Sequence, residues 1–279
     1  MMKLTFILGL ICAVCSEGFG QHAAYFDSLV HQKTELPIAF DLRETGMLSP
    51  VRVQPSGGCW ISASNASIES FWRKSGKEGI RLSDKNPLLY SGFDESRKSN
   101  GNHFMVTAVY SRRDGPLPYN PEMDTLPQKN PVLPAVLTDA RYLPDSAELI
   151  KSVIRDFGGV YSMMYHSKNK GLDTITDIYY APKKKINHVV CLVGWNDTLE
   201  TQWGRGVWIA QNSLGTRYAD GGFIYIPYQD ELILTENACW PGWTDYNPNT
   251  QLYYYDTLGS QRSYGFDNPL SYGMVKYTA

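Results

Sequence analysis

The spacing of apolar residues changes half way along the chain. Between residues 59 and 73 they recur three or four positions apart, which predicts a helix with one buried face. Similar patterns predict helices over 104–111 and 145–157. Residues 114–134 are rich in proline and predict an irregular loop. The first half is therefore expected to be mainly helical.

The second half carries a different pattern. Short runs rich in β-branched and aromatic residues, separated by turn residues, predict strands at 160–165, 189–195, 206–210 and 222–228. Helices followed by strands favour an α+β fold with two segregated subdomains. A cleft between the two subdomains is the expected place for a functional site.

The N-terminus has the layout of a signal peptide. Lys3 precedes an apolar stretch over 4–14, which is too short to span a bilayer, and small residues at 18 and 20 suit a cleavage site. We therefore expect residues 1–20 to be removed and 21–35 to form a short N-terminal segment of a secreted or periplasmic protein. No other segment is apolar for long enough to cross a membrane.

The charge balance argues against a nucleic-acid partner. The 279 residues carry a formal net charge of −2, and the longest basic run is only Lys183 to Lys185. Nucleic-acid binding needs a concentrated basic surface. Hydrophobic residues make up 43% of the chain, enough for a substantial core.

Signal removal leaves three cysteines, Cys59, Cys191 and Cys239. An odd number in an exported protein leaves at least one thiol unpaired within the chain. Cys59 follows two glycines and begins a predicted helix. The glycines allow close approach of a substrate, and a helix N-terminus favours the nucleophilic thiolate. The alternative is that Cys59 is simply a small buried apolar residue.

A thiolate of this kind needs a base and an orienting group. His188 stands directly before the apolar strand, and Asn212 follows the strand that begins at residue 206. Each has an ordinary structural alternative, a structural histidine and a turn asparagine. The order Gln54, Cys59, His188, Asn212 favours a nucleophile, its base and a side chain that orients the base.

These motifs together resemble the papain-like cysteine peptidases, known as the C1 family. The resemblance spans most of residues 36–228. It is carried by four motifs in the same order as in the family: Leu36-Pro37 through Asp41-Leu42-Arg43, Val51-Arg52-Val53-Gln54 with Gly58-Cys59-Trp60, Asn187-His188 with Val193-Gly194-Trp195, and Val207-Trp208-Ile209 with Asn212-Ser213, Gly215-Thr216 and Gly222-Phe223. The resemblance implies a papain-like fold of two subdomains, a helical N-terminal half and an antiparallel, barrel-like C-terminal half, with the active-site cleft between them.

A narrower resemblance is to the microbial branch that carries a lectin-like domain after the peptidase. It rests on Gly101-Asn102, on Gly158 to Tyr161 and on the tyrosine-rich tail. We therefore expect a peptidase domain over 36–240 and, over 241–279, the start of a lectin-like domain. A glycan contact through this partial accessory domain is part of that expectation.

The resemblance implies a role for each site residue. Cys59 would attack the scissile carbonyl of a peptide or protein substrate and form an acyl-enzyme, with His188 as base and Asn212 orienting it. Gln54 and the Cys59 N–H would stabilise the oxyanion. The resemblance implies no metal and no cofactor. The expected substrate-binding residues are Gly58, Asn100 and Gly101.

The chain departs from the family pattern at three places. One residue fewer separates Gln54 from Cys59, Leu214 replaces a tryptophan that shields the histidine, and Ser56 replaces a cysteine. The family disulfide made by that cysteine is therefore absent. Cys191 is expected to be buried in its strand, and a Cys191–Cys239 bridge is the alternative.

Three functions remain open from the sequence. The first is an endopeptidase acting through Cys59, His188 and Asn212. The second is a catalytically impaired papain-like fold that binds peptide or glycan, favoured by the shortened loop and Leu214. The third is a different acyl transfer on a similar Cys-His scaffold.

Overall fold

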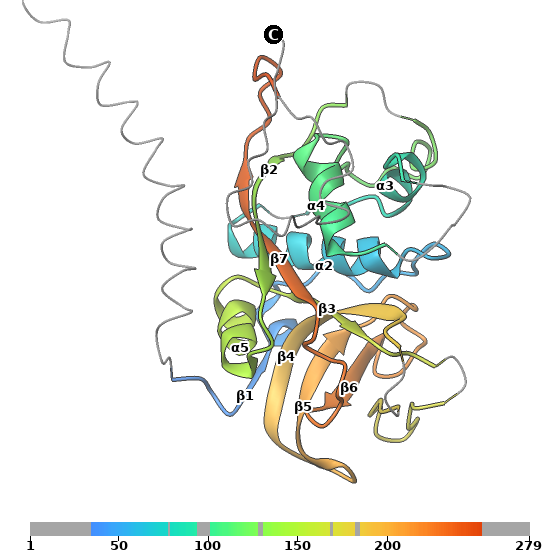
Figure 1. Cartoon of the computed structure of the whole chain (residues 1–279), viewed down its shortest axis with the longest axis vertical. Coiled ribbons are helices and arrows are strands. Elements are labelled where there is room, and N and C mark those ends of the chain that lie inside the picture. Colours follow the sequence, from blue (N-terminus) through green and yellow to red (C-terminus); the bar gives the residue numbers. More distant parts are fainter. Residues whose placement is uncertain are drawn as a thin grey trace, which may run out of the picture.

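The computed structural model, drawn in Figure 1, describes residues 35–77, 79–93, 101–127, 131–167, 170–181 and 185–252. Its helical elements are η1 (Leu42–Thr45), α2 (Cys59–Lys74), α3 (Lys85–Tyr90), α4 (His103–Ser111) and α5 (Ala147–Asp156). Its strands are β1 (Ala39–Asp41), β2 (Val136–Leu143), β3 (Val160–Met164), β4 (His188–Thr201), β5 (Gly204–Gln211), β6 (Phe223–Pro227) and β7 (Asn237–Thr244).

The strands form one seven-stranded antiparallel sheet. Its order is β2-β7-β3-β4-β5-β6, and β1 pairs with β4 beside this path. Figure 1 shows α2, α3 and α4 gathered on one part of the molecule, whereas β3 to β6 make up the other. The order places β7, the last described strand, between β2 and β3.

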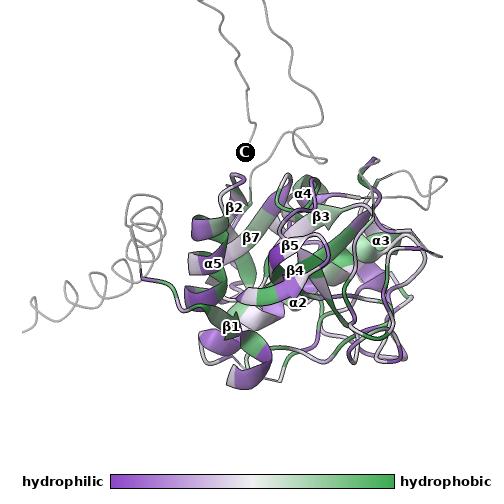
Figure 2. Ribbon diagram, turned by 90° about the horizontal axis from the view of Figure 1, so that it is seen from below, coloured by the Kyte–Doolittle hydropathy of each residue, from purple (hydrophilic) through white to green (hydrophobic). Residues whose placement is uncertain are grey.

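Two hydrophobic cores correspond to these two parts. One core joins α5 to the sheet and includes Ile150, Val190 and Trp208. The other joins α2 and α4 to the sheet and includes Trp60 and Trp240. On α5, Figure 2 shows hydrophilic residues on the side turned away from the sheet, as expected for a helix with one buried stripe.

The predicted α+β class with two subdomains is confirmed. α2, α4 and α5 lie where the apolar spacing predicts helices, and β3 to β6 lie where strands are predicted. The sequence patterns did not predict β2 and β7. In β2 the alternation is broken by irregular pairing between Leu137 and Arg141, and β7 contains Pro241 and Gly242. β7 runs to Thr244, four residues beyond the predicted domain end.

None of the described helices is long and apolar enough to cross a membrane. The predicted signal peptide and most of the 21–35 segment lie outside the described residues, as does the tail from 253 onward. Their interpretation stays a prediction.

Candidate active site

The loop before Cys59 closes as a tight turn. The Gly58 N–H donates to the Pro55 carbonyl at 2.8 Å, and Gly57 has a φ of 71°. Glycine adopts this left-handed conformation without strain. A Cβ on Gly58 would lie 2.6 Å from Pro55 Cγ, so the turn requires glycine there as well. The shortened loop is therefore accommodated, and it delivers Cys59 as the first residue of α2.

The Cys59 thiol is buried, with 6% of the residue exposed. Burial raises the pKa of the thiol, and the backbone N–H groups of Val189, Trp60 and Cys59 itself act in the opposite direction. The Val189 N–H ties the sulfur to the second residue of β4. Because His188 is the first residue of that strand, the structure brings the α2 N-terminus and His188 to the same place.

His188 and Asn212 are joined directly. His188 Nε2 lies 2.9 Å from Asn212 Oδ1, which also accepts the Ser213 N–H at 2.8 Å. An amide oxygen only accepts hydrogen bonds, so Nε2 carries the proton and the Nδ1 lone pair of a neutral His188 is free. Burial lowers the pKa of His188, and the bond to Asn212 opposes that shift. The pair is well covered, with 7% and 1% of the two residues exposed.

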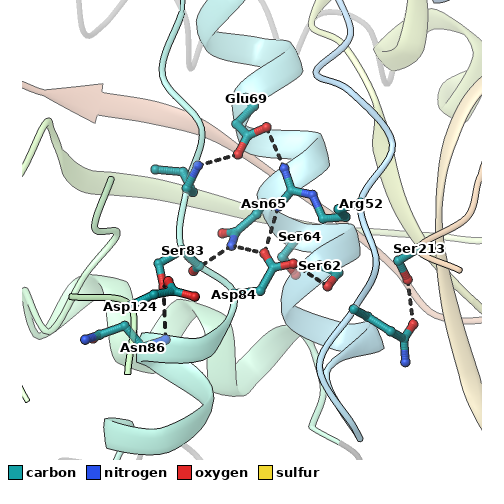
Figure 3. Close-up of polar contacts among 12 residues, drawn as sticks. Arg52, Ser62, Ser64, Asn65, Glu69, Ser83, Asp84, Asn86, Asp124 and Ser213 are labelled. Atoms are coloured by element: carbon teal, nitrogen blue, oxygen red, sulfur yellow. Dashed lines mark hydrogen bonds and ion pairs between the residues drawn. The ribbon is translucent and has the colours of Figure 1, made fainter. Parts of the chain in front are cut away.

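Gln54 is held beside this pair by a short backbone pairing. Gln54 N–H donates to the Ser213 carbonyl at 2.8 Å, and Val53 bridges to Leu214. Ser213 Oγ, labelled in Figure 3, donates to Gln54 Oε1 at 2.6 Å. Since the amide oxygen is engaged, the Gln54 NH2 group is the end available to donate to a ligand. Gln54 therefore adjoins the loop that carries Asn212.

A buried ionic network supports the same segment, and the sequence analysis did not identify it. Arg52 contacts Glu69 at 2.6 Å and Asp84 at 2.7 Å, and all three lie in the interior view of Figure 3. Glu69 also accepts the Leu82 N–H, and Asp84 accepts the Ser62 hydroxyl. The network ties the segment that leads into Gln54 to the middle of α2. Two features of the sequence could have indicated this network. Arg52 is a charged residue between two valines, and Glu69 lies on an apolar face of the predicted helix.

Of the predicted substrate-binding residues, the structure describes Gly58 and Gly101 but not Asn100. Gly101 is buried against Trp60, because a Cβ there would lie 2.3 Å from the indole ring. Asn102 caps α4 by accepting the Met105 N–H at 3.0 Å. Gly101 thus packs on the residue that follows Cys59. Asn100 lies outside the described residues.

The remaining cysteines are structural. Cys191 and Cys239 are both free and buried, so the alternative of a bridge between them is not realised. Burial raises the pKa of Cys191 to about 12 and also raises that of Cys239. Leu214, in place of the expected tryptophan, is 36% exposed. No cluster of three or more metal-ligating side chains occurs within the described part of the chain.

Comparisons with known proteins identify the family of this chain. The family model described as papain family cysteine protease matches residues 36–240. A cysteine proteinase of Trypanosoma brucei brucei is 26% identical over 72% of this chain and 46% of its own length. Cathepsin J of Mus musculus is 25% identical over 70% of this chain and 62% of its own. The chain thus spans about half to two thirds of the length of these relatives.

Solved structures show the same fold. The cysteine protease and lectin-like domains of Cwp84, a surface-layer-associated protein of Clostridium difficile, align with a TM-score of 0.69 and 19% identity over 81% of this chain and 56% of that one. The bromelain protease of Ananas comosus aligns with a TM-score of 0.59 and 19% identity over 74% of this chain and 99% of that one. With a family model matching 205 of 279 residues, the chain belongs to the papain family of cysteine proteases.

Proposed function

We propose that this protein is a cysteine endopeptidase that hydrolyses peptide bonds through Cys59, His188 and Asn212. The observation that carries the proposal is the bond between His188 Nε2 and Asn212 Oδ1. It fixes the imidazole with Nδ1 free, and the Val189 N–H joins the neighbouring backbone to the Cys59 sulfur. A nucleophile, a base and a group that orients the base are the parts that acyl transfer requires.

The proposed reaction proceeds in two halves. Cys59 transfers its proton to His188 Nδ1, and the sulfur attacks the scissile carbonyl carbon. The tetrahedral intermediate collapses, the C–N bond breaks, and His188 returns the proton to the leaving amine. Water then attacks the thioester as His188 accepts its proton, and that proton goes back to the sulfur as the acid product leaves.

Charge on the carbonyl oxygen is stabilised at the start of α2. The Cys59 N–H is one of the unpaired groups at the helix N-terminus, and the Gln54 NH2 group is the second donor. The anchoring of Gln54 to Ser213 supports this assignment, because a donor held in advance needs no reorganisation during the reaction. Gly58 and Gly101 are proposed to bind substrate backbone, together with Asn100.

We also propose that the protein acts after export, in a secreted or periplasmic setting, with peptide or protein as its substrate. The support is the apolar N-terminal stretch over residues 4–14 and its small-residue cleavage site. Mass spectrometry of the mature N-terminus tests this directly. A mature chain that begins at Gln21 is the expected result, and an intact Met1 in protein from the producing cell contradicts it.

Covalent labelling tests the peptidase assignment. Wild-type protein is incubated under reducing conditions, at mildly acid and neutral pH, with an epoxide inhibitor of papain-like peptidases, and turnover of a fluorogenic peptide is followed in parallel. We expect one label, on Cys59, and loss of hydrolysis. Cys59→Ala should abolish both, whereas Cys239→Ala, which removes another buried free thiol, should retain both.

Other outcomes separate the alternatives. Absence of labelling at every pH contradicts the peptidase and favours a binding module built on the same fold. Labelling of Cys59 together with incorporation of an added amine, without net hydrolysis, favours a different acyl transfer.

A further inference from the structure

A second imidazole ring lies against His188. His166 follows the end of β3 by two residues, and its ring centroid is 4.8 Å from that of His188, with the planes tilted by 44°. The pairing of Met164 with His188 in the sheet brings the end of β3 to the start of β4. The sequence patterns gave no reason to connect two histidines 22 positions apart.

The backbone of His166 is fixed from the strand that carries His188. The His166 N–H donates to Asn187 Oδ1 at 2.7 Å, and Asn187 Nδ2 donates back to the His166 carbonyl at 2.9 Å. Asn187 immediately precedes His188 in the chain. One side chain thus holds both partners of the histidine pair at a set distance.

The ring of His166 is held separately by two tyrosines. His166 Nε2 lies 2.9 Å from the Tyr218 hydroxyl, and Tyr179 stacks on the imidazole with centroids 5.1 Å apart and planes within 14°. The Tyr179 hydroxyl accepts the Ser167 N–H at 2.7 Å. His166 therefore has one orientation, with one face covered by Tyr179 and its ring next to His188.

The surroundings of the pair favour a neutral His166. Burial lowers the pKa of His166 to about 4, and His188 acts in the same direction. Within the described ranges, Tyr179 and Tyr218 face His166, whereas Asn212 faces His188. Among the described carboxylates, Asp230 raises the pKa of Tyr179, whereas no carboxylate contributes to the pKa shift of either imidazole.

We propose that His166 is a positioning residue for His188: its neutral ring keeps the base aligned between Asn212 and Cys59, and its protonation disables the site. The inference rests on the proposed function, in which His188 cycles through an imidazolium. A neutral ring tolerates that charge, whereas a second imidazolium at this separation repels it. Leu214 stands where family members have a tryptophan that shields the histidine, and Leu214 is itself 36% exposed. His188 must therefore be covered from another side, which supports the assignment of that role to His166.

The proposal predicts a particular acid limb. In the free enzyme one protonation, at His188, removes the base, and a second protonation follows at His166, whose pKa is lowered to about 4. The logarithm of kcat/KM should therefore fall with a slope that rises above one as the pH approaches 4. His166→Phe keeps a planar ring but cannot bind a proton, so its slope should be one.

The rate constants give a second readout. His166→Ala should lower kcat by about 10- to 100-fold with little change in KM, because a misaligned base slows proton transfer without weakening substrate binding. His166→Phe should recover most of that loss near neutral pH. Tyr218→Phe removes the hydroxyl that holds the ring and should lie between the two. Tyr225→Phe, whose hydroxyl donates to Asp220 instead, is the matched control and should behave as wild type.

The measurements use an uncharged fluorogenic peptide and, in parallel, the pH dependence of Cys59 alkylation by iodoacetamide, read by mass spectrometry. Circular dichroism at each pH confirms that every variant remains folded. One outcome overturns the role of His166 and leaves the proposed function standing. In it, hydrolysis depends on Cys59, but His166→Phe has the wild-type slope and His166→Ala has the wild-type kcat. Another outcome overturns the proposed function and this inference together. In it, the wild-type protein shows no Cys59-dependent hydrolysis, and Cys59 is alkylated no faster than Cys239.

Discussion

Gln54 illustrates how one side chain is prepared for its role by its neighbours. Its backbone pairs with Ser213, and its amide oxygen accepts the Ser213 hydroxyl. These two bonds engage the backbone N–H and the amide oxygen, so the amide nitrogen is left as the group available to a ligand. The residue after Asn212 thereby also sets the position of the proposed oxyanion donor.

Replacing Gln54 by alanine tests this at the residue scale. We expect kcat of Gln54→Ala to fall on the order of 100- to 1000-fold, the usual effect of losing one oxyanion donor. The rate of Cys59 alkylation should stay close to that of wild type, since the thiol and imidazole are untouched. Gln202→Ala, at an exposed hairpin position, is the control. A parallel fall in alkylation would show that Gln54 acts on the thiol instead.

At this scale the sequence was informative where chemistry is local. Cys59, His188 and Asn212 were singled out by local patterns, and their order along the chain together with the resemblance to papain-like peptidases gave their predicted roles. Arg52 and His166 were not singled out, because their partners lie far away in the chain and only the fold brings them together. The sequence indicated a turn-like stretch over 54–58, but it could not show how the shortened loop places Gln54 relative to Ser213.

At the scale of elements, α2 is held to the segment before it by charge as well as by apolar contact. Arg52 lies between Glu69 on α2 and Asp84 at the start of α3, with only 3% of its side chain exposed. Breaking a buried ion pair from one side leaves uncompensated charge, which costs far more than losing an exposed pair.

Arg52→Met should therefore lower the free energy of unfolding by about 3 to 5 kcal/mol, measured by urea denaturation. The matched control is Arg205→Met, which breaks a pair with Glu200 in which both side chains are more than 60% exposed. That change should cost no more than about 1 kcal/mol. Equal effects of the two substitutions would contradict the role given to the buried network.

Helices and strands with a regular spacing of apolar residues were predicted from the sequence, whereas those with an irregular spacing were not. α5 repeats its apolar residues cleanly and has Ser146 as its cap, so it was found with nearly correct ends. β2 and β7 pair with each other but contain a bulged register and a proline, which hide the alternation of a strand. For this reason the patterns did not predict β2, which lies at the middle of the chain, between the mainly helical half and the β-rich half.

At the scale of the whole molecule, buried neutral histidines predict sensitivity to acid. His103 is 3% exposed, and burial lowers its pKa from 6.5 to about 4. Below pH 6.5 the unfolded chain binds a proton that the folded chain does not. Folding is therefore favoured fully above pH 6.5 and loses stability as the pH falls from there toward 4.

The loss attributable to His103 should be at most about 2 to 3 kcal/mol at pH 4.5, because Glu236 Oε2 lies 3.7 Å from His103 Nε2 and partly stabilises the protonated ring. Urea denaturation at pH 7.5 and 4.5 measures it, by comparing wild type with His103→Gln. The variant should lose less stability between the two pH values by that amount, whatever its stability at pH 7.5. An identical pH dependence in both proteins would place the acid-sensitive groups elsewhere.

The position of β7 has a consequence for the timing of biosynthesis. β7 fills the gap between β2 and β3, and its Ala238 and Trp240 pack in the same core as Cys59 and Trp60. A ribosome delivers Cys59, His188 and Asn212 before it delivers this strand. The proposed nucleophile is therefore expected to lack part of its supporting core until residue 244 has been made, so that the proposed peptidase would be inactive in an incomplete chain.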